Sequence, residues 1–265
     1  MHHDVDNSPK DNTDDSLMDR DFDIMEMPVS GLAAYWLSLK KILDDQEDDS
    51  LLLEESQHTS EPYISHILRL AASPFGDERV SLLAKEKKRT LLHDLRRKLD
   101  LVDITVRALF ANENPRLTIV RMNAIFSAPR IAEHEVFETA TQWLASIRED
   151  DADLAKFAEV DHVHRSETLL IKLIFCQMYA RRMGRDACRL LAPYVRFGSL
   201  SEAFLLIADG FEEDIVISIL RSRKKELLSD TACKMDMALE LALGVRNHFP
   251  YEDIFTIAMS YMNTT

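Results

Sequence analysis

Two histidines and two carboxylates around residue 162 form the cluster whose chemistry would be metal binding. His162 and His164 are two residues apart, with Asp161 before them and Glu167 after them. Imidazole and carboxylate groups bind zinc, but a helix would turn positions two apart by about 200°, so only an extended segment could bring both rings to one ion. Because no third histidine or cysteine lies nearby in the sequence, we interpret the cluster as a polar loop before a buried helix.

A second cluster is acidic and would suit acid–base chemistry only if it were sheltered from water. Glu133, His134, Glu135 and Glu138 fall in one helical stretch, and the His134–Glu138 spacing is typical of a solvated helix face. The chain contains no His-Glu-x-x-His, glycine-rich phosphate loop or Gly-x-Ser-x-Gly pattern. Cys176 lies among apolar residues, which keep a thiol protonated and unreactive. We therefore expect no enzymatic activity and no cofactor.

Basic side chains gather in three helical stretches, at residues 85–98, 181–189 and 221–225. Such surpluses can neutralise the phosphates of a nucleic acid, and they can also form ordinary solvated faces. Acidic neighbours such as Glu86 and Glu226 partly neutralise these stretches. The residues that would form a nucleic-acid-binding patch are Lys88, Arg89, Arg96, Arg97, Arg221, Arg223, Lys224 and Lys225.

The net charge of -14 is concentrated near the N-terminus. Residues 1–58 contain 16 acidic and 4 basic side chains, whereas residues 59–265 contain 30 acidic and 28 basic ones. Net acidity argues against a simple nucleic-acid-binding protein. A tethered acidic segment could also dock on the basic stretches of its own chain, and salt would weaken that contact.

We expect residues 1–29 to form an acidic, disordered leader, because they contain too few apolar side chains to offset chain entropy. Phe22, Ile24, Met25 and Met27 alternate with acidic residues, which is typical of a short segment that orders on a partner. The alternative is a terminus that folds back onto its own domain. These four residues are our candidates for protein binding.

From residue 30 onwards, apolar residues recur at helical spacing and predict helices. Six glycines and eight prolines are few for this length, which favours long helices joined by short loops. We expect one helix to end near residue 99 and another to begin at Asp100 or Asp103. A second break is expected between residues 228 and 230, and Pro193 should split the segment 185–197. Residues 166–183 should form the most buried helix.

These elements predict an all-α fold, either an irregular multi-helix bundle or a short α-solenoid of antiparallel helical hairpins. We expect one helical domain over residues 30–265, which an acidic break near residues 150–165 would subdivide. Cys176, Cys188 and Cys233 are expected to be buried free thiols in a reducing compartment. The absence of an apolar leader or membrane span predicts a cytoplasmic protein, with secretion lacking a cleavable signal peptide left open.

The C-terminal third is rich in methionine and aromatic residues, which suit either a core or an adaptable binding surface, and we favour the core. We expect the chain to be a non-enzymatic protein–protein interaction module. It would serve as an adaptor, regulator or secreted-factor-like scaffold, with the leader as a partner-docking or autoinhibitory segment. The alternative is a helical nucleic-acid-associated regulator. The sequence leaves the identity of the partner and the oligomeric state of the protein open. The methionine and aromatic residues of the C-terminal third, which we assign to the core, are Met235, Met237, Phe249, Tyr251, Phe255, Met259, Tyr261 and Met262.

Overall fold

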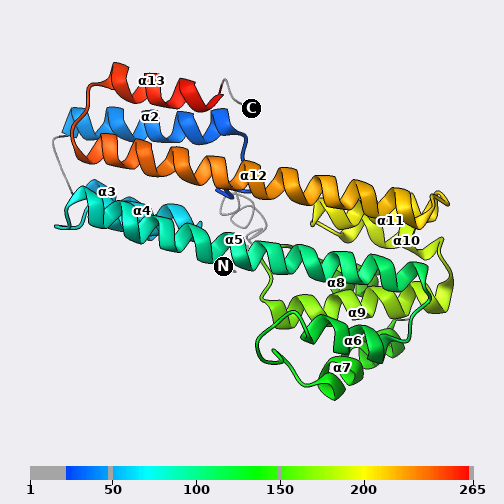
Figure 1. Ribbon diagram of the computed structural model, residues 1–265. Helices are drawn as coiled ribbons and strands as arrows, with labels where there is room; N and C mark the ends of the chain where they lie inside the picture. The colour runs from blue at the N-terminus through cyan, green and yellow to red at the C-terminus, as the bar shows by residue number, and fades with distance from the viewer. Residues whose placement is uncertain (1–21, 47–49, 148–150, 263–265) are drawn as a thin grey trace, which may run out of the picture. The chain divides into compact units, whose positions relative to one another are not determined.

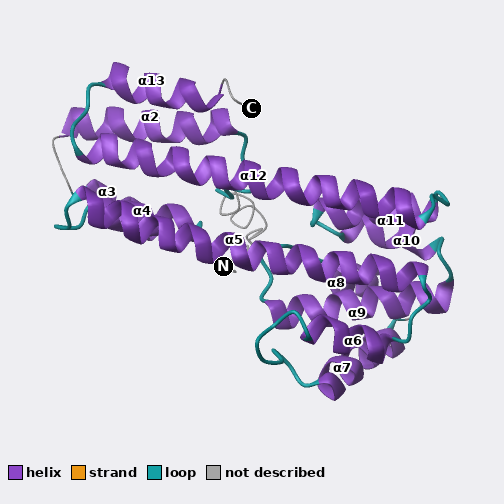
Figure 2. Ribbon diagram, in the orientation of Figure 1, coloured by secondary structure: helices purple, strands orange, loops and turns teal. Residues whose placement is uncertain are grey.

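The computed structural model describes residues 22–46, 50–147 and 151–262, and over these ranges the protein is all-α (Figures 1 and 2). The described residues form twelve α-helices and one short 3-10 helix, with no strands. None of these helices combines the length and apolarity that a bilayer crossing requires. Chain contacts divide the protein into two compact units: unit 1 contains the described residues up to Leu91 and from Asp230 onwards, and unit 2 contains Leu92–Ser229.

Unit 1 is built from segments at both ends of the described chain. Its helices are α2 (Val29–Gln46), α3 (Leu51–His58), α4 (Pro62–Ala71), the first part of α5 (Asp77–Phe110), the last part of α12 (Glu213–Arg246) and α13 (Tyr251–Met262). α3 packs against α4, and α13 packs against α2 (Figure 1). Leu32, Trp36 and Leu39 of α2 are buried, as their helical spacing predicts.

The residues that precede α2 fold back onto unit 1. Phe22 packs against Tyr35 with ring centroids 4.4 Å apart, and Ile24 is 3% exposed. Lys234 Nζ donates to the Met25 carbonyl over 3.2 Å, while Met27 is half-buried. The expected disordered leader therefore ends before residue 29, because apolar burial holds this segment in place. The rest of that leader, residues 1–21, lies outside the described residues.

Unit 2 is organised around one buried helix, as the sequence predicts. Its elements are the last part of α5, α6 (Pro115–Asn123), α7 (Glu133–Ser146), α8 (Asp151–Ala158), α9 (Ser166–Met183), α10 (Ala187–Leu191), a 3-10 turn (Ala192–Tyr194), α11 (Gly198–Ala208) and the first part of α12. α9 contacts α6, α7, α8 and α10. Most of its apolar residues, including Leu173 and Phe175, are buried in one core whose buried members all lie between residues 99 and 220, whereas Met183 in its last turn is 58% exposed.

The expected breaks within α5 and α12 are wrong, since each helix runs without interruption for 34 residues. Aspartate often begins a helix, but here each aspartate has a cationic partner. Asp100 pairs with Lys224, and Asp103 lies 3.0 Å from Arg107. Asp230 lies 2.6 Å from Lys234, four residues along the same helix. Such spacing stabilises a helix interior, so tertiary and local ion pairs override the start signal.

Other helix ends follow the expected local chemistry. Asn114 caps α6 by accepting from the Arg116 N–H at 3.1 Å, with Pro115 in the first turn. Gly184 ends α9 with a φ of 91°, a conformation that favours glycine. Pro193 lies in the 3-10 turn that follows α10, as predicted.

The three cysteine thiols differ in burial. Cys176 and Cys188 are buried and free, and burial raises the pKa of both to about 12. Cys233 is only partly buried, contrary to expectation, because its side of α12 is less covered. Residues 151–165 lie inside unit 2, and a subdivision near residues 150–165 stays a prediction.

Candidate functional site

The histidines near residue 162 each have a local partner in unit 2. His162 Nδ1 lies 3.0 Å from the Asp161 carboxylate, and His164 Nε2 lies 3.0 Å from the Glu159 carbonyl. The hydrogen bond with His162 lowers the pKa of Asp161 to about 2. This segment is a polar loop before α9, as expected, and its hydrogen bonds stabilise that loop.

The predicted basic patch is divided between the two units. In unit 1, Lys88 lies 2.6 Å from Asp236 and Arg89 lies 2.7 Å from Glu86. Lys88 therefore ties α5 to α12 inside one unit. Both residues form ion pairs with carboxylates of the chain itself.

In unit 2 the same pattern recurs on α12. Arg223 lies 3.3 Å from both Glu202 and Glu226, and Lys224 pairs with Asp100. On α5, the Arg97 guanidinium stacks over the Phe126 ring at 5.8 Å. The remaining members have exposed positions and no ion pair within the described ranges: Arg96, Arg221 and Lys225.

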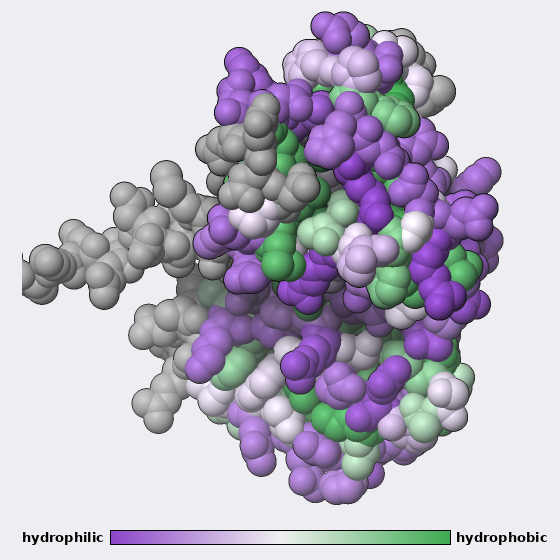
Figure 3. All heavy atoms as spheres, turned by 90° about the vertical axis from the view of Figure 1, so that its left-hand side faces the viewer, coloured by the Kyte–Doolittle hydropathy of each residue, from purple (hydrophilic) through white to green (hydrophobic). Residues whose placement is uncertain are grey.

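A different feature distinguishes one end of unit 1, where α2, α4 and α12 end and α3, α5 and α13 begin (Figure 1). Large apolar side chains stand exposed in the terminal turns and loops there, each between 41% and 48% accessible. Figure 3 looks onto this end and shows apolar surface among hydrophilic side chains. The residues are Ile42, Leu53, Phe75, Phe249, Tyr251 and Phe255, and we call this set the end face of unit 1.

A pocket of about 550 Å³ opens among the helices that carry this end face. Its walls combine apolar side chains with polar and charged ones. The apolar ones include Leu43 of α2, Leu52 of α3, Ala71 of α4 and Val245 of α12, and the polar ones are Lys40, Asp44, Ser73, Arg246 and His248. The volume lies within the range of pockets that take small ligands or a large partner side chain, about 300–1,000 Å³. The end face thus combines protruding aromatic rings with a recess.

Arg246 holds the wall of this pocket in place. Its guanidinium donates to the Leu70 carbonyl at 3.1 Å and also to the Phe75 carbonyl, and it lies 3.3 Å from the Asp77 carboxylate. The Leu70 carbonyl lies in the last turn of α4 and also accepts from the Ser73 N–H at 3.1 Å, whereas Phe75 lies in the loop between α4 and α5. Arg246 therefore joins α4, α5 and α12, and its charge is already neutralised.

The corner between α12 and α13 sets the direction of the exposed rings. His248 adopts a φ of 52°, and the Phe249 N–H reaches back to the Gly244 carbonyl over 2.9 Å, which ends α12 in a Schellman turn. Gly244 has no side chain, so Ile254 of α13 packs directly onto it; a Cβ there would lie 2.4 Å from Ile254 Cδ1. Ile254 is fully buried, whereas Tyr251, the first residue of α13, is 42% exposed.

Charge plays a secondary part at the end face. Exposed acids (Asp45, Glu54, Glu78, Glu252 and Asp253) stand beside exposed bases (Lys41, Arg69 and Arg79) in the neighbouring turns. The exposed acids in these turns outnumber the exposed bases, so the surroundings of the apolar residues carry a modest negative charge.

Sequence reasoning assigned the aromatic residues of the C-terminal third to the core, and the structure divides them. Met235 and Met237 are buried as expected, whereas Phe249, Tyr251 and Phe255 are exposed. One signal was present: residues 251–262 carry apolar side chains on more than one helical face, so one stripe could not bury them all.

No protein-family model, curated protein or solved structure matches this chain.

Proposed function

We propose that this protein is a non-enzymatic protein–protein interaction module and that it binds a partner through the end face of unit 1. The observation that carries the proposal is the group of exposed aromatic and aliphatic side chains around a 550 Å³ pocket. Exposed apolar groups cost free energy in water, and clusters of them mark interaction sites. Phenylalanine and tyrosine are also enriched at the centres of interfaces.

The geometry favours a partner that presents a protruding apolar segment. One large side chain of the partner would enter the pocket against Leu43, Leu52 and Val245, and its neighbours would cover Tyr251 and Phe255. Binding energy in such interfaces comes mainly from a few buried anchors. An adaptor or regulator acting in the cytoplasm would use its surface in this way.

We propose, as the sequence suggests, that the acidic leader is a partner-docking or autoinhibitory segment. Ile24 is buried in unit 1, and Phe22 and Met25 are half-buried, so these residues anchor the preceding chain to the unit that carries the end face. Partner binding by Phe22, Ile24, Met25 and Met27 stays a prediction. If the leader is autoinhibitory, its removal should strengthen binding at the end face.

The test places a photo-crosslinking amino acid at position 255 of the full-length chain and, as a matched control, at position 117. Leu117 is 51% exposed on α6, which belongs to unit 2. A partner captured only from position 255 is then purified and titrated against the wild type, F255S and L117S. We expect F255S to weaken binding about 5- to 30-fold, since loss of an aromatic anchor costs about 1–2 kcal/mol, and L117S to have no effect.

Equal affinity of the wild type and F255S for every captured partner would overturn the assignment of the site. Capture of a second copy of the chain would assign the end face to self-association, which sedimentation equilibrium at rising concentration would confirm. Both variants replace side chains that are less than 60% buried, so their folds should persist. Circular dichroism of each variant checks this.

Nucleic-acid binding through basic helix faces stays the alternative. The ion pairs of Lys88, Arg89, Arg223 and Lys224 with acidic residues lower the charge available to phosphates. Captured complexes that dissolve on nuclease treatment, with affinity falling steeply as salt rises, would favour this alternative.

A further inference from the structure

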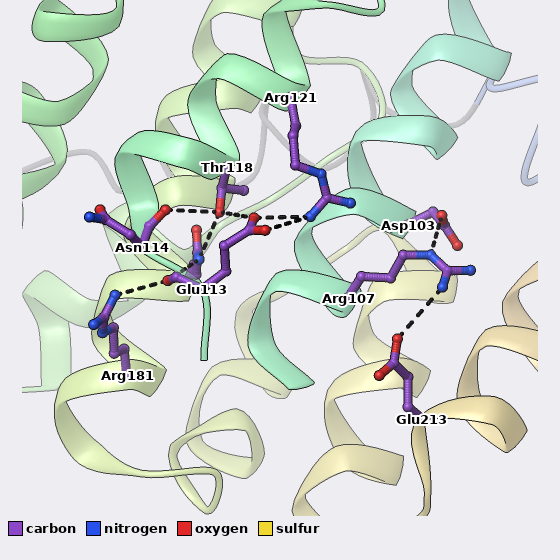
Figure 4. Close-up of polar contacts among 9 residues, drawn as sticks. Asp103, Arg107, Glu113, Asn114, Thr118, Arg121, Arg181 and Glu213 are labelled. Atoms are coloured by element: carbon purple, nitrogen blue, oxygen red, sulfur yellow. Dashed lines mark hydrogen bonds and ion pairs between the residues drawn. The ribbon is translucent and has the colours of Figure 1, made fainter. Parts of the chain in front are cut away.

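A second pocket, of about 310 Å³, lies within unit 2 where α5 ends and α9 ends. α5 stops in a Schellman turn: Asn112 takes a φ of 46°, and the Glu113 N–H donates to the Ala108 carbonyl at 2.9 Å. This turn brings Glu113 across the C-terminal half of α9. Figure 4 shows the polar contacts that surround it.

The Glu113 carboxylate is already neutralised. Both its oxygens accept from Arg121 Nη1, at 2.9 and 3.0 Å, and the Thr118 hydroxyl donates to one of them at 2.8 Å. In Figure 4 this carboxylate points toward Arg121 and Thr118, while Arg181 meets the backbone carbonyl of Glu113. The only acidic side chain in the pocket wall therefore adds no free negative charge to it.

Gln177 locks this arrangement from α9. Its amide nitrogen donates to the Glu113 carbonyl at 3.1 Å and to the Thr118 hydroxyl oxygen at 3.0 Å. Because the Thr118 hydrogen is committed to Glu113, the amide must present its nitrogen there, which turns Oε1 the other way. Gln177 is 1% exposed, and its buried Oε1 has no donor within the described residues. Gln177 therefore fixes the position of Glu113 and Thr118 at the pocket wall.

Two guanidinium groups in the wall keep their charge. Arg181 donates to the Glu113 carbonyl at 2.9 Å, and Arg185 lies 3.4 Å from the Phe110 carbonyl with its plane over the Phe110 ring at 5.4 Å. Arg107, by contrast, lies within ion-pair distance of both Asp103 and Glu213 (Figure 4). In the described part of the chain, neither Arg181 nor Arg185 has a carboxylate partner.

Apart from Asn112, the remaining side chains of the pocket wall are apolar or a thiol. Leu109, Ala180 and Ile207 line the pocket, together with Cys188, whose thiol burial keeps protonated with a pKa of about 12. Two positive charges beside an apolar recess suit a ligand that combines a negative charge with an apolar group. A phosphate would use only the arginines, whereas a carboxylate attached to a short hydrocarbon would use the arginines and the apolar walls.

We propose that this pocket binds a carboxylate that carries a short branched apolar group. The carboxylate accepts from Arg181 and Arg185, and the hydrocarbon packs against Leu109, Ala180 and Ile207. This chemistry has two sources: a free branched-chain carboxylic acid and the C-terminal leucine-like residue of a polypeptide. The site lies in unit 2, and it is independent of the end face of unit 1.

The test titrates the full-length protein with isocaproate, N-acetyl-leucine and N-acetyl-leucinamide, and follows the Ile207 methyl resonances by NMR. Both acids should shift these resonances saturably, and the amide should not. R185Q should weaken binding of the acids about tenfold, since a hydrogen bond to a charged group contributes about 1.5–3 kcal/mol. R182Q is the matched control, because Arg182 is an exposed neighbour outside the pocket wall.

The two acids distinguish the sources. Equal affinity assigns the pocket to a free carboxylic acid, and tighter binding of N-acetyl-leucine assigns it to a polypeptide C-terminus. Three results would overturn the proposal: no saturable shift with either acid, equal binding of the acid and its amide, or equal affinity of R185Q and R182Q. If inorganic phosphate competes as strongly as isocaproate, the apolar walls do not contribute to binding.

Discussion

At the scale of single residues, Glu61 at the start of α4 is a buried carboxylate with a raised pKa. It is 6% exposed, and its carboxylate caps the helix by accepting from the Ile64 N–H at 2.6 Å. Burial, opposed in part by this hydrogen bond and by a second backbone N–H, raises its pKa from 4.5 to about 7. Side chains of this length can cap a helix only when tertiary packing folds them back, and sequence spacing does not report that.

The raised pKa of Glu61 gives stability a defined pH dependence. The folded state binds the proton more tightly than the unfolded state, so this group favours folding most below about pH 4.5 and loses that contribution as pH rises to about 7. E61Q retains an acceptor for the cap and removes the charge. We expect the variant to gain about 1–3 kcal/mol over the wild type at pH 8, and less at pH 5.

Urea unfolding of both proteins at several pH values between 5 and 8 measures this difference. E54Q is the control, because Glu54 is exposed in the first turn of α3. A constant difference between the wild type and E61Q across the whole range would show that the charge of Glu61 is not penalised by burial.

At the scale of helices, local patterns predicted those elements whose ends are set by the chain itself. α9 begins at Ser166 and ends at Met183 because apolar spacing and Gly184 specify both limits. The breaks expected within α5 and α12 are wrong because Asp100 and Asp230 resemble start signals. The Lys224 partner of Asp100 is distant in the sequence and becomes apparent only after folding, whereas Lys234 is four residues from Asp230 and its spacing already suits a helix interior. The end face of unit 1 also escaped prediction, since it is made by six helix ends that meet in space.

The junction of α12 with α13 depends on the missing side chain of Gly244. A Cβ at this position would lie 2.4 Å from Ile254 Cδ1 and 3.3 Å from Phe249 Cδ2, so G244A must push α13 outward or force Ile254 into another rotamer. Overpacking of this kind costs about 1–3 kcal/mol. We therefore expect G244A to lower the free energy of unfolding by that amount.

G198A is the matched control for G244A, because a Cβ at Gly198, the first residue of α11, meets nothing within 4 Å. It should leave stability unchanged or raise it by a few tenths of a kcal/mol through lower chain entropy. Thermal and urea denaturation of the three proteins supply the comparison. Equal stabilities of G244A and G198A would show that α13 does not rest on Gly244 at this distance.

At the scale of the whole chain, no glycine- or proline-rich linker marks where unit 1 ends and unit 2 begins. The boundaries fall inside α5, after Leu91, and inside α12, before Asp230. Both helices run through these points with ordinary helical composition, so sequence patterns describe one continuous helical body. Units defined by packing become apparent only when the core contacts are known.

The connectivity of the two units predicts how fragments of the chain should behave. Unit 2 is one continuous segment, residues 92–229, whose buried core lies wholly between Leu99 and Leu220. Unit 1 needs α12 and α13 from the C-terminal end to cover α2 and to bind the Met25 carbonyl through Lys234. A fragment of residues 92–229 should therefore fold alone, whereas residues 1–91 should not, because the apolar side of α2 loses its partner.

Far-UV circular dichroism and urea titration of both fragments test this expectation. Residues 92–229 should be helical and unfold in one cooperative transition, and residues 1–91 should show little cooperative structure until residues 230–265 are added. A cooperative transition in residues 1–91 alone would mean that α2, α3, α4 and the start of α5 close a core without the C-terminal helices. A fragment of residues 92–229 that shows little helix and no cooperative transition would mean instead that its buried core is too weak to fold without unit 1, so that folding of the chain is a single event.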